Sequence, residues 1–386
     1  MKSRLLLIAL LLLALGGGAL WWLSNQAAAA GPAASLVPLL AEENQAGFAQ
    51  VTVPNAVHFP RDLGPHNDYQ IEWWYYTGNL ATEDGRPFGF ELTFFRRAMT
   101  PDAPEAPARL WRTNQIYLAH FAVSDVGAET FYDFERFSRG AAGLAGAQAV
   151  PYRVWLEDWF VEEVTPGRVR LLAETDQVTL DLLLTETLPP ILHGDGGLSQ
   201  KGPEPGNASY YYSIVQQQAR GTVTVQGDSY AVTGRAWKDH EYSTSALSPG
   251  TVGWDWFSLQ FPDGSALMVV EGRREDGTPD DFSNGTYIAP DGATQALTLG
   301  DWELEVLDRW TSPASGAEYP SRWRVTIPQL ELELEGEPLL ADQELNVSTS
   351  YWEGAVRFSG MQAGQPVDAL GYVEMTGYGG SITGLQ

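Results

Sequence analysis

The chain has 386 residues, of which 44% are hydrophobic and 12% aromatic, a composition that excludes a disordered protein. Its net charge of −26 argues against binding to nucleic acid or to anionic lipid, because an acidic surface repels phosphate groups. The sequence contains no cysteine, so disulfides and thiol catalysis are excluded. The length is sufficient for two domains.

The first residues predict export. A short basic segment precedes an uncharged apolar run at residues 5–23, and four alanines at 27–30 offer a small-residue cleavage site. Residues 1–30 are therefore a cleaved signal peptide or, since the run is just long enough to span a bilayer, an uncleaved membrane anchor. In both cases we expect a periplasmic or other extracytoplasmic location. Residues 31–50 are predicted to be a linker.

Beyond the linker, alternation of apolar and polar residues predicts antiparallel β-strands almost throughout. Clear examples occur at residues 168–173, 178–184, 222–225, 323–327 and 330–334. Asp-Gly or Asn-Gly pairs predict hairpin turns at 84–85, 263–264, 276–277, 284–285 and 291–292. Residues 194–208 are predicted to be a loop, suited to a domain boundary or a cavity lid.

One unit of sequence occurs twice. An aromatic and acidic cluster, a hairpin turn and an arginine pair follow one another from Glu72 to Arg97 and again from Gly253 to Arg274. This repeat predicts an all-β chain of two tandem antiparallel domains, each a barrel or a strongly curved sheet, because many strands must close or cover their edges. We expect the domains at residues 51–220 and 221–386.

The segment QIEWWYYTG, residues 70–78, places four aromatic residues after a carboxylate. On a strand, alternate side chains share a face. One face then carries Glu72, Trp74 and Tyr76, and the other carries Trp73 and Tyr75. We expect one aromatic pair to line an interior and the other to pack outward. Glu72 is either an acid with a raised pKa between aromatic walls, or an ionised partner of Arg96 or Arg97.

The densest polar cluster is GRAWKDHEYS, residues 234–243. Trp237, Asp239 and Glu241 share one face of the predicted strand, and His240 lies on the other. Asp239 and His240 are candidates for acid–base chemistry. Alternatively, Asp239 or Glu241 pairs with Arg273 at a junction between domains. In the WDW motif, Trp254 and Trp256 share a face and Asp255 points away.

Several common catalytic motifs are absent from the sequence. The five histidines show no HExxH or HxH spacing, so we expect no dedicated metal site. A nucleophile elbow, a P-loop and a dinucleotide fingerprint are also missing, so we expect no cofactor.

Four motifs resemble those of a known family: EWWYYTG at 72–78, AWKDHE at 236–241, GWDWF at 253–257 and GYVEMTGY at 371–378. From about residue 50 to its end, the chain resembles the AttH-type secreted proteins, labelled predicted secreted hydrolases and related to carotenoid 1,2-hydratase (hydroxyneurosporene synthase). The resemblance implies two lipocalin-like β-barrels in tandem.

Three functions follow from these observations. The first is an exported protein that binds a large apolar ligand, an isoprenoid, carotenoid or lipid, in an aromatic-lined cavity. The expected lining is Glu72, Trp73, Trp74, Tyr75, Tyr76, Trp237, Glu241, Trp254 and Trp256. The second is a cofactor-independent hydratase, for which Asp239, His240 and Asp255 are the candidate catalytic residues. The third, which the resemblance implies, is an accessory module of an envelope ABC-type transporter.

Overall fold

The computed structural model describes residues 45–102, 112–245, 248 and 250–379. The expected signal peptide or anchor at 1–30 and most of the expected linker at 31–50 lie outside these residues. Among the helices of the described residues, none has the length and apolar character needed to cross a membrane.

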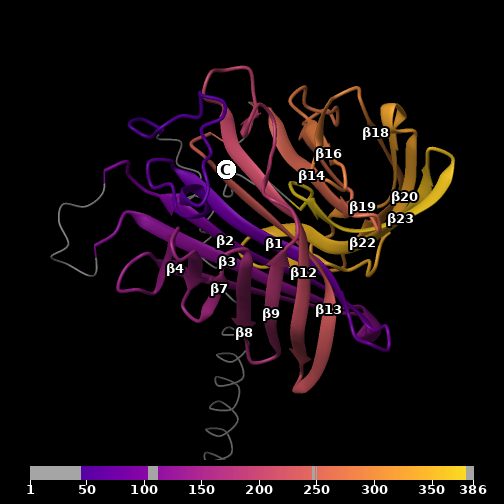
Figure 1. Ribbon diagram of the computed structural model, residues 1–386, viewed down its shortest axis with the longest axis horizontal. Coiled ribbons are helices and arrows are strands. Elements are labelled where there is room, and N and C mark those ends of the chain that lie inside the picture. The colour runs from indigo at the N-terminus through magenta and orange to yellow at the C-terminus, as the bar shows by residue number, and fades with distance from the viewer. Residues whose placement is uncertain (1–44, 103–111, 246–247, 249, 380–386) are drawn as a thin grey trace, which may run out of the picture.

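Two antiparallel sheets, of 13 and 10 strands, make up this part of the chain (Figure 1). The strands of the first sheet are β1 (Ile71–Ala81), β2 (Pro87–Ala98), β3 (Gln115–Asp125), β4 (Thr130–Arg139), β5 (Ala145–Gln148), β6 (Arg153–Leu156), β7 (Trp159–Thr165), β8 (Arg168–Glu174), β9 (Val178–Glu186), β10 (Ile191–Leu192), β11 (Leu198–Gln200), β12 (Ala208–Val225) and β13 (Asp228–Ser243). Those of the second are β14 (Thr251–Gln260), β15 (Ala266–Arg274), β16 (Asn284–Ile288), β17 (Thr294–Thr298), β18 (Glu303–Thr311), β19 (Glu318–Ile327), β20 (Leu332–Pro338), β21 (Glu344–Asn346), β22 (Ser350–Gln362) and β23 (Gln365–Met375). Short 3₁₀ turns lie at η1 (Arg61–Leu63), η2 (Val126–Ala128) and η3 (Pro328–Leu330).

Both sheets have the same arrangement around their first hairpin. The first strand of each sheet lies between the second strand and the last, so β1 lies between β2 and β13, and β14 lies between β15 and β23. The first sheet curls into a nearly closed barrel and the second forms a half-barrel (Figure 1). The structure confirms the predicted all-β fold of two lipocalin-like domains.

The chain passes from the first sheet to the second between β13 and β14. β13 pairs along its length with β12, and its second half pairs with β1, so the first sheet extends to Ser243. This position is later than the boundary expected at residues 220–221. β12 and β13 form one long hairpin, whose turn at Gln226 and Gly227 has positive φ at both residues. Such a turn suits a two-residue hairpin, but Gln-Gly is a weaker signal than Asn-Gly or Asp-Gly.

Strand β1 is buried on both of its faces. Trp74 and Tyr76 belong to the core inside the first barrel and are fully buried. Tyr75 faces the other way and packs with Trp237 and with Trp256 of the second sheet. The two cores explain why residues 71–76 read as a nearly continuous apolar run rather than as an alternating one.

Candidate functional site

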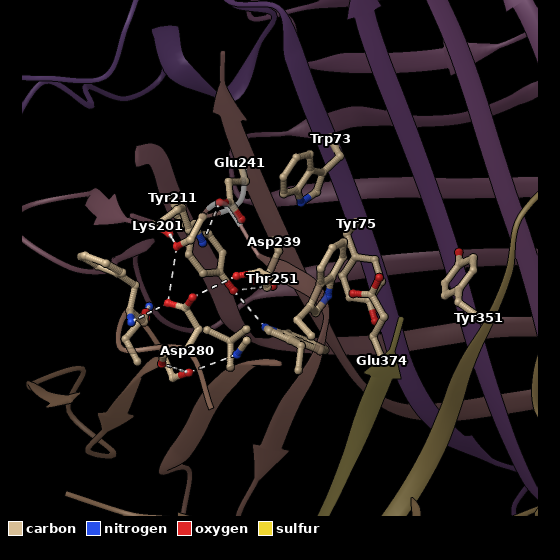
Figure 2. Close-up of a pocket in the computed structure, with 18 of the residues that line it drawn as sticks. Trp73, Tyr75, Lys201, Tyr211, Asp239, Glu241, Thr251, Asp280, Tyr351 and Glu374 are labelled. Carbon is tan, nitrogen blue, oxygen red and sulfur yellow. Dashed lines mark hydrogen bonds and ion pairs between the residues drawn. The ribbon is translucent and has the colours of Figure 1, made fainter. Parts of the chain in front are cut away.

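A cavity of about 120 Å³, partly open to solvent, lies between the two sheets. Trp73 and Tyr75 project into it from β1, while Glu374 reaches it from β23 of the second sheet (Figure 2). Its aromatic lining is Trp73, Tyr75, Phe95, Tyr211, Trp254, Trp256, Phe282 and Tyr351. Its charged lining is Lys201, Asp239, Glu241, Asp280 and Glu374. Aromatic walls with a few carboxyl groups are suited to a mainly apolar ligand.

Three donors hold Asp239 at the wall of this cavity. The Ser213 hydroxyl donates to Oδ1, and so does the Trp237 indole N–H, at 2.7 Å. The Tyr211 hydroxyl donates to Oδ2, also at 2.7 Å. Burial raises the pKa of Asp239 to about 7, and these hydrogen bonds oppose that rise. The carboxyl group is therefore fixed in position by its own strand and by β12.

Glu374 is a second carboxyl group at the cavity whose pKa is raised. Burial raises the pKa of Glu374 to about 8, a hydrogen bond from Trp254 opposes this rise, and the charges of Asp239 and Glu241 add to it. Beside it on β22, Glu353 accepts a hydrogen bond from Tyr75. Burial, together with the nearby Glu374, also holds the pKa of Glu353 well above its usual range. At neutral pH Glu374 is thus mainly a neutral acid.

Glu241 forms another part of the wall with Lys201. The two side chains form an ion pair at 2.9 Å, and Ser209 donates a hydrogen bond to the same carboxylate. Lys201 comes from the segment 194–208, which was predicted as a loop and contributes here to the cavity wall.

The expected pairing of Asp239 or Glu241 with Arg273 is not formed. Arg273 instead lies 3.1 Å from Asp255, its neighbour in the β14–β15 hairpin, because a partner in the same hairpin is nearer than one in the other sheet. Asp255 also accepts a hydrogen bond from the Tyr378 hydroxyl at 2.9 Å. Burial raises the pKa of Asp255, and Arg273 opposes this rise. Asp255 is not among the residues that line the cavity.

The opposite face of β1 and β13 places Glu72, Trp74, Tyr76 and His240 inside the first barrel rather than at the cavity. Glu72 accepts a hydrogen bond from Arg96 Nε at 2.7 Å, which confirms the ion-pair interpretation. Burial alone would raise the pKa of Glu72, but Arg96 and His66 hold it well below its usual range. The Nε2 atom of His240 lies 2.8 Å from Glu72 Oε1.

The fold thus brings together part of the predicted set. The cavity is lined by Trp73, Tyr75, Asp239, Glu241, Trp254 and Trp256, and Trp237 supports Asp239 from behind. Sequence reasoning missed Glu374, Lys201 and Tyr211. Glu374 lies in the motif GYVEMTGY. The alternation of side chains along a strand shows which residues share a face, but it does not show which other sheet packs against that face.

Comparison with known proteins places the chain in a family. The AttH-like family model matches residues 50–378. A solved structure of a Nitrosomonas europaea protein assigned as AttH is 37% identical, covers 86% of this chain and 100% of its own, and superposes with a TM-score of 0.76. The structure of kievitone hydratase from Nectria haematococca is 16% identical, covers 85% of this chain and 96% of its own, and has a TM-score of 0.63, which shows a shared fold. A search of curated proteins finds no match. The chain belongs to the AttH-like family.

Proposed function

We propose that the protein binds an apolar molecule with a carbon–carbon double bond between its two sheets and adds water across that bond. The observation that carries this proposal is the position of Glu374, a buried acid whose pKa is raised to about 8, in a cavity with aromatic walls. Protonation of an alkene needs a neutral acid at working pH, and a buried carboxyl group next to other carboxyl groups meets that need.

The reaction needs no group beyond the chain's own residues, water and the alkene. The π electrons of the double bond take the proton of Glu374, which forms a C–H bond and leaves a carbocation on the other carbon. The faces of Trp73 and Trp254 stabilise that positive charge. Water then forms the C–O bond, and its surplus proton returns to the Glu374 carboxylate. Asp239 is held by its three donors where it can orient the water.

Two further observations support this assignment. A cavity of about 120 Å³ takes the end of a long molecule rather than the whole of it, which suits reaction at a terminal double bond. The fold is also shared with kievitone hydratase, although that likeness concerns the fold alone.

A second candidate is a carrier that binds the apolar molecule without converting it. It is favoured by the contacts of Asp239 and Glu241, since both carboxyl groups are already engaged by neighbouring side chains. The two candidates share the ligand and the cavity, and they differ only in whether Glu374 transfers its proton.

The test uses farnesol as the probe, in water enriched in heavy oxygen, with the product analysed by mass spectrometry. Tryptophan fluorescence measures binding separately, because Trp73, Trp254 and Trp256 line the cavity. We expect Glu374→Gln to bind farnesol as the wild type does and to lose at least about a hundredfold in hydration rate. Glu333→Gln, which changes an exposed glutamate on β20, should leave farnesol binding and the hydration rate unchanged. Binding without incorporation of oxygen in the wild type would establish the carrier instead, and absence of binding would contradict both candidates.

A further inference from the structure

Two histidines and a glutamate meet inside the first barrel, on the face of β1 and β13 that points away from the cavity. His66 Nδ1 lies 2.7 Å from Glu72 Oε1, and His240 Nε2 lies 2.8 Å from the same oxygen. Donor atoms of all three residues lie within 4.8 Å of one another. Two imidazole nitrogens and a carboxylate oxygen gathered this closely form a donor set suited to a divalent transition-metal ion.

Each of these side chains is also held from behind through its other polar atom. His66 Nε2 lies 3.2 Å from Asp62 Oδ1, and His240 Nδ1 lies 2.8 Å from the Tyr212 hydroxyl. Glu72 Oε2 accepts a hydrogen bond from Arg96 at 2.7 Å, which leaves Oε1 to the two imidazoles. Metal-binding histidines and carboxylates typically have such supporting partners, which fix the ring tautomer and its orientation.

We propose that His66, Glu72 and His240 bind a divalent first-row transition-metal ion, for which Zn²⁺ is the probe. Metal–ligand bonds of about 2.0–2.2 Å separate neighbouring donors by roughly 3.3 Å around a tetrahedral ion. Each of the two short contacts therefore opens by about half an ångström when the ion enters. His66 can make that adjustment, because it lies in the segment between η1 and β1 and its side chain is 14% exposed.

The motif rules for zinc miss this site because its ligands come from three separate segments. Neighbours on one strand point to opposite faces, so β13 supplies only His240, β1 supplies only Glu72, and the segment before β1 supplies His66. The ion would tie that segment to both strands. The site lies on the other face of the sheet from Asp239, and it is independent of the reaction proposed for the cavity.

The experiment uses the full chain, freed of metal with a chelator and then titrated with Zn²⁺ by calorimetry. We expect one Zn²⁺ per chain, a rise in the thermal midpoint on binding, and no competition from Ca²⁺, which prefers oxygen ligands. His66→Gln and His240→Gln should abolish this binding. Asp62→Asn alters the carboxylate that supports His66 and also pairs with Arg61, but it removes no ligand, and it should weaken binding by about 10–100-fold.

His58→Gln is the control for adventitious binding, since His58 is exposed and lies outside the cluster. It should bind Zn²⁺ as the wild type does. Absence of stoichiometric binding to the wild type would overturn the proposal, and this result does not depend on how any variant folds. Equal binding by the wild type and His66→Gln would overturn it as well, because it would place the ion elsewhere.

Discussion

At the scale of single residues, the acids between the sheets have the largest consequences. Glu91 on β2 is fully buried, and it lies near Glu353 and Glu374 of the second sheet. Burial raises the pKa of Glu91 to about 8, and the neighbouring Glu374 adds to this rise. All three carboxyl groups therefore favour the neutral form where the two sheets meet.

The raised pKa of Glu91 predicts a fall in the free energy of unfolding between about pH 4.5 and about pH 8. Because the folded state raises the pKa of Glu91, its contribution is fully present below the unfolded pKa near 4.5 and is lost as the pH rises to about 8. Glu91→Gln removes this dependence. At about pH 9 the variant should exceed the wild type in free energy of unfolding by on the order of a few kcal/mol, since each pKa unit corresponds to about 1.4 kcal/mol.

Urea unfolding of both proteins at about pH 5 and about pH 9 measures the effect. Glu83→Gln, at an exposed position, should have the same free energy of unfolding as the wild type at both pH values. Parallel pH dependence of Glu91→Gln and the wild type would show that Glu91 is not the group responsible.

At the scale of elements, the repeated hairpin contains one interaction in both sheets. An acid on its first strand pairs with an arginine on its second, as Glu72 with Arg96 and as Asp255 with Arg273. In the second sheet the guanidinium of Arg273 also stacks on Tyr378, 3.6 Å from the ring centre. Removal of the arginine leaves a carboxyl group buried without its cation, which is costly.

We therefore expect Arg273→Met to lower the free energy of unfolding by about 3–5 kcal/mol. Arg274→Met provides a comparison, since the adjacent arginine is itself exposed and pairs with the exposed Asp281 and, at 3.6 Å, with Asp280, so its loss should be clearly smaller. Chemical denaturation of the wild type and of the two variants measures the free energy of unfolding that each substitution removes. Similar small losses in both would mean that the buried pair contributes little.

The hairpin was also the element that the sequence predicted best. The turn at Asp84 and Gly85, the division of the β1 side chains between two faces and the arginine of β2 could all be predicted, because each depends on neighbours in the chain. The cavity was less predictable. The approach of β23 to β1 depends on how two sheets pack, so Glu374 was not recognised as part of the site. The cluster of His66, Glu72 and His240 escaped prediction for the same reason.

At the scale of the whole molecule, the two sheets share an apolar core. Tyr75, Tyr211 and Trp237 of the first sheet pack in one cluster with Trp256 and Tyr372 of the second. A shared core of this kind makes each sheet depend on the other for burial of its aromatic surface.

The protein should therefore unfold in one cooperative step. Calorimetry is expected to give a single thermal transition, whose midpoint agrees with that from tryptophan fluorescence. Trp256→Ala should lower that midpoint without splitting the transition, because it removes a side chain from the shared cluster. Two resolved transitions in the wild type would show that the sheets are stable independently.

Strand β13 has a further consequence for how such a protein can change over evolutionary time. Between residues 237 and 242 its side chains alternate between the cavity side and the barrel interior, and all six are buried. No position in this segment faces water, so none is free to vary without affecting one interior or the other. An insertion of one residue would exchange the two sets of side chains. The two interiors can therefore diverge only together, whereas the exposed residues of β18 can accept substitutions one at a time.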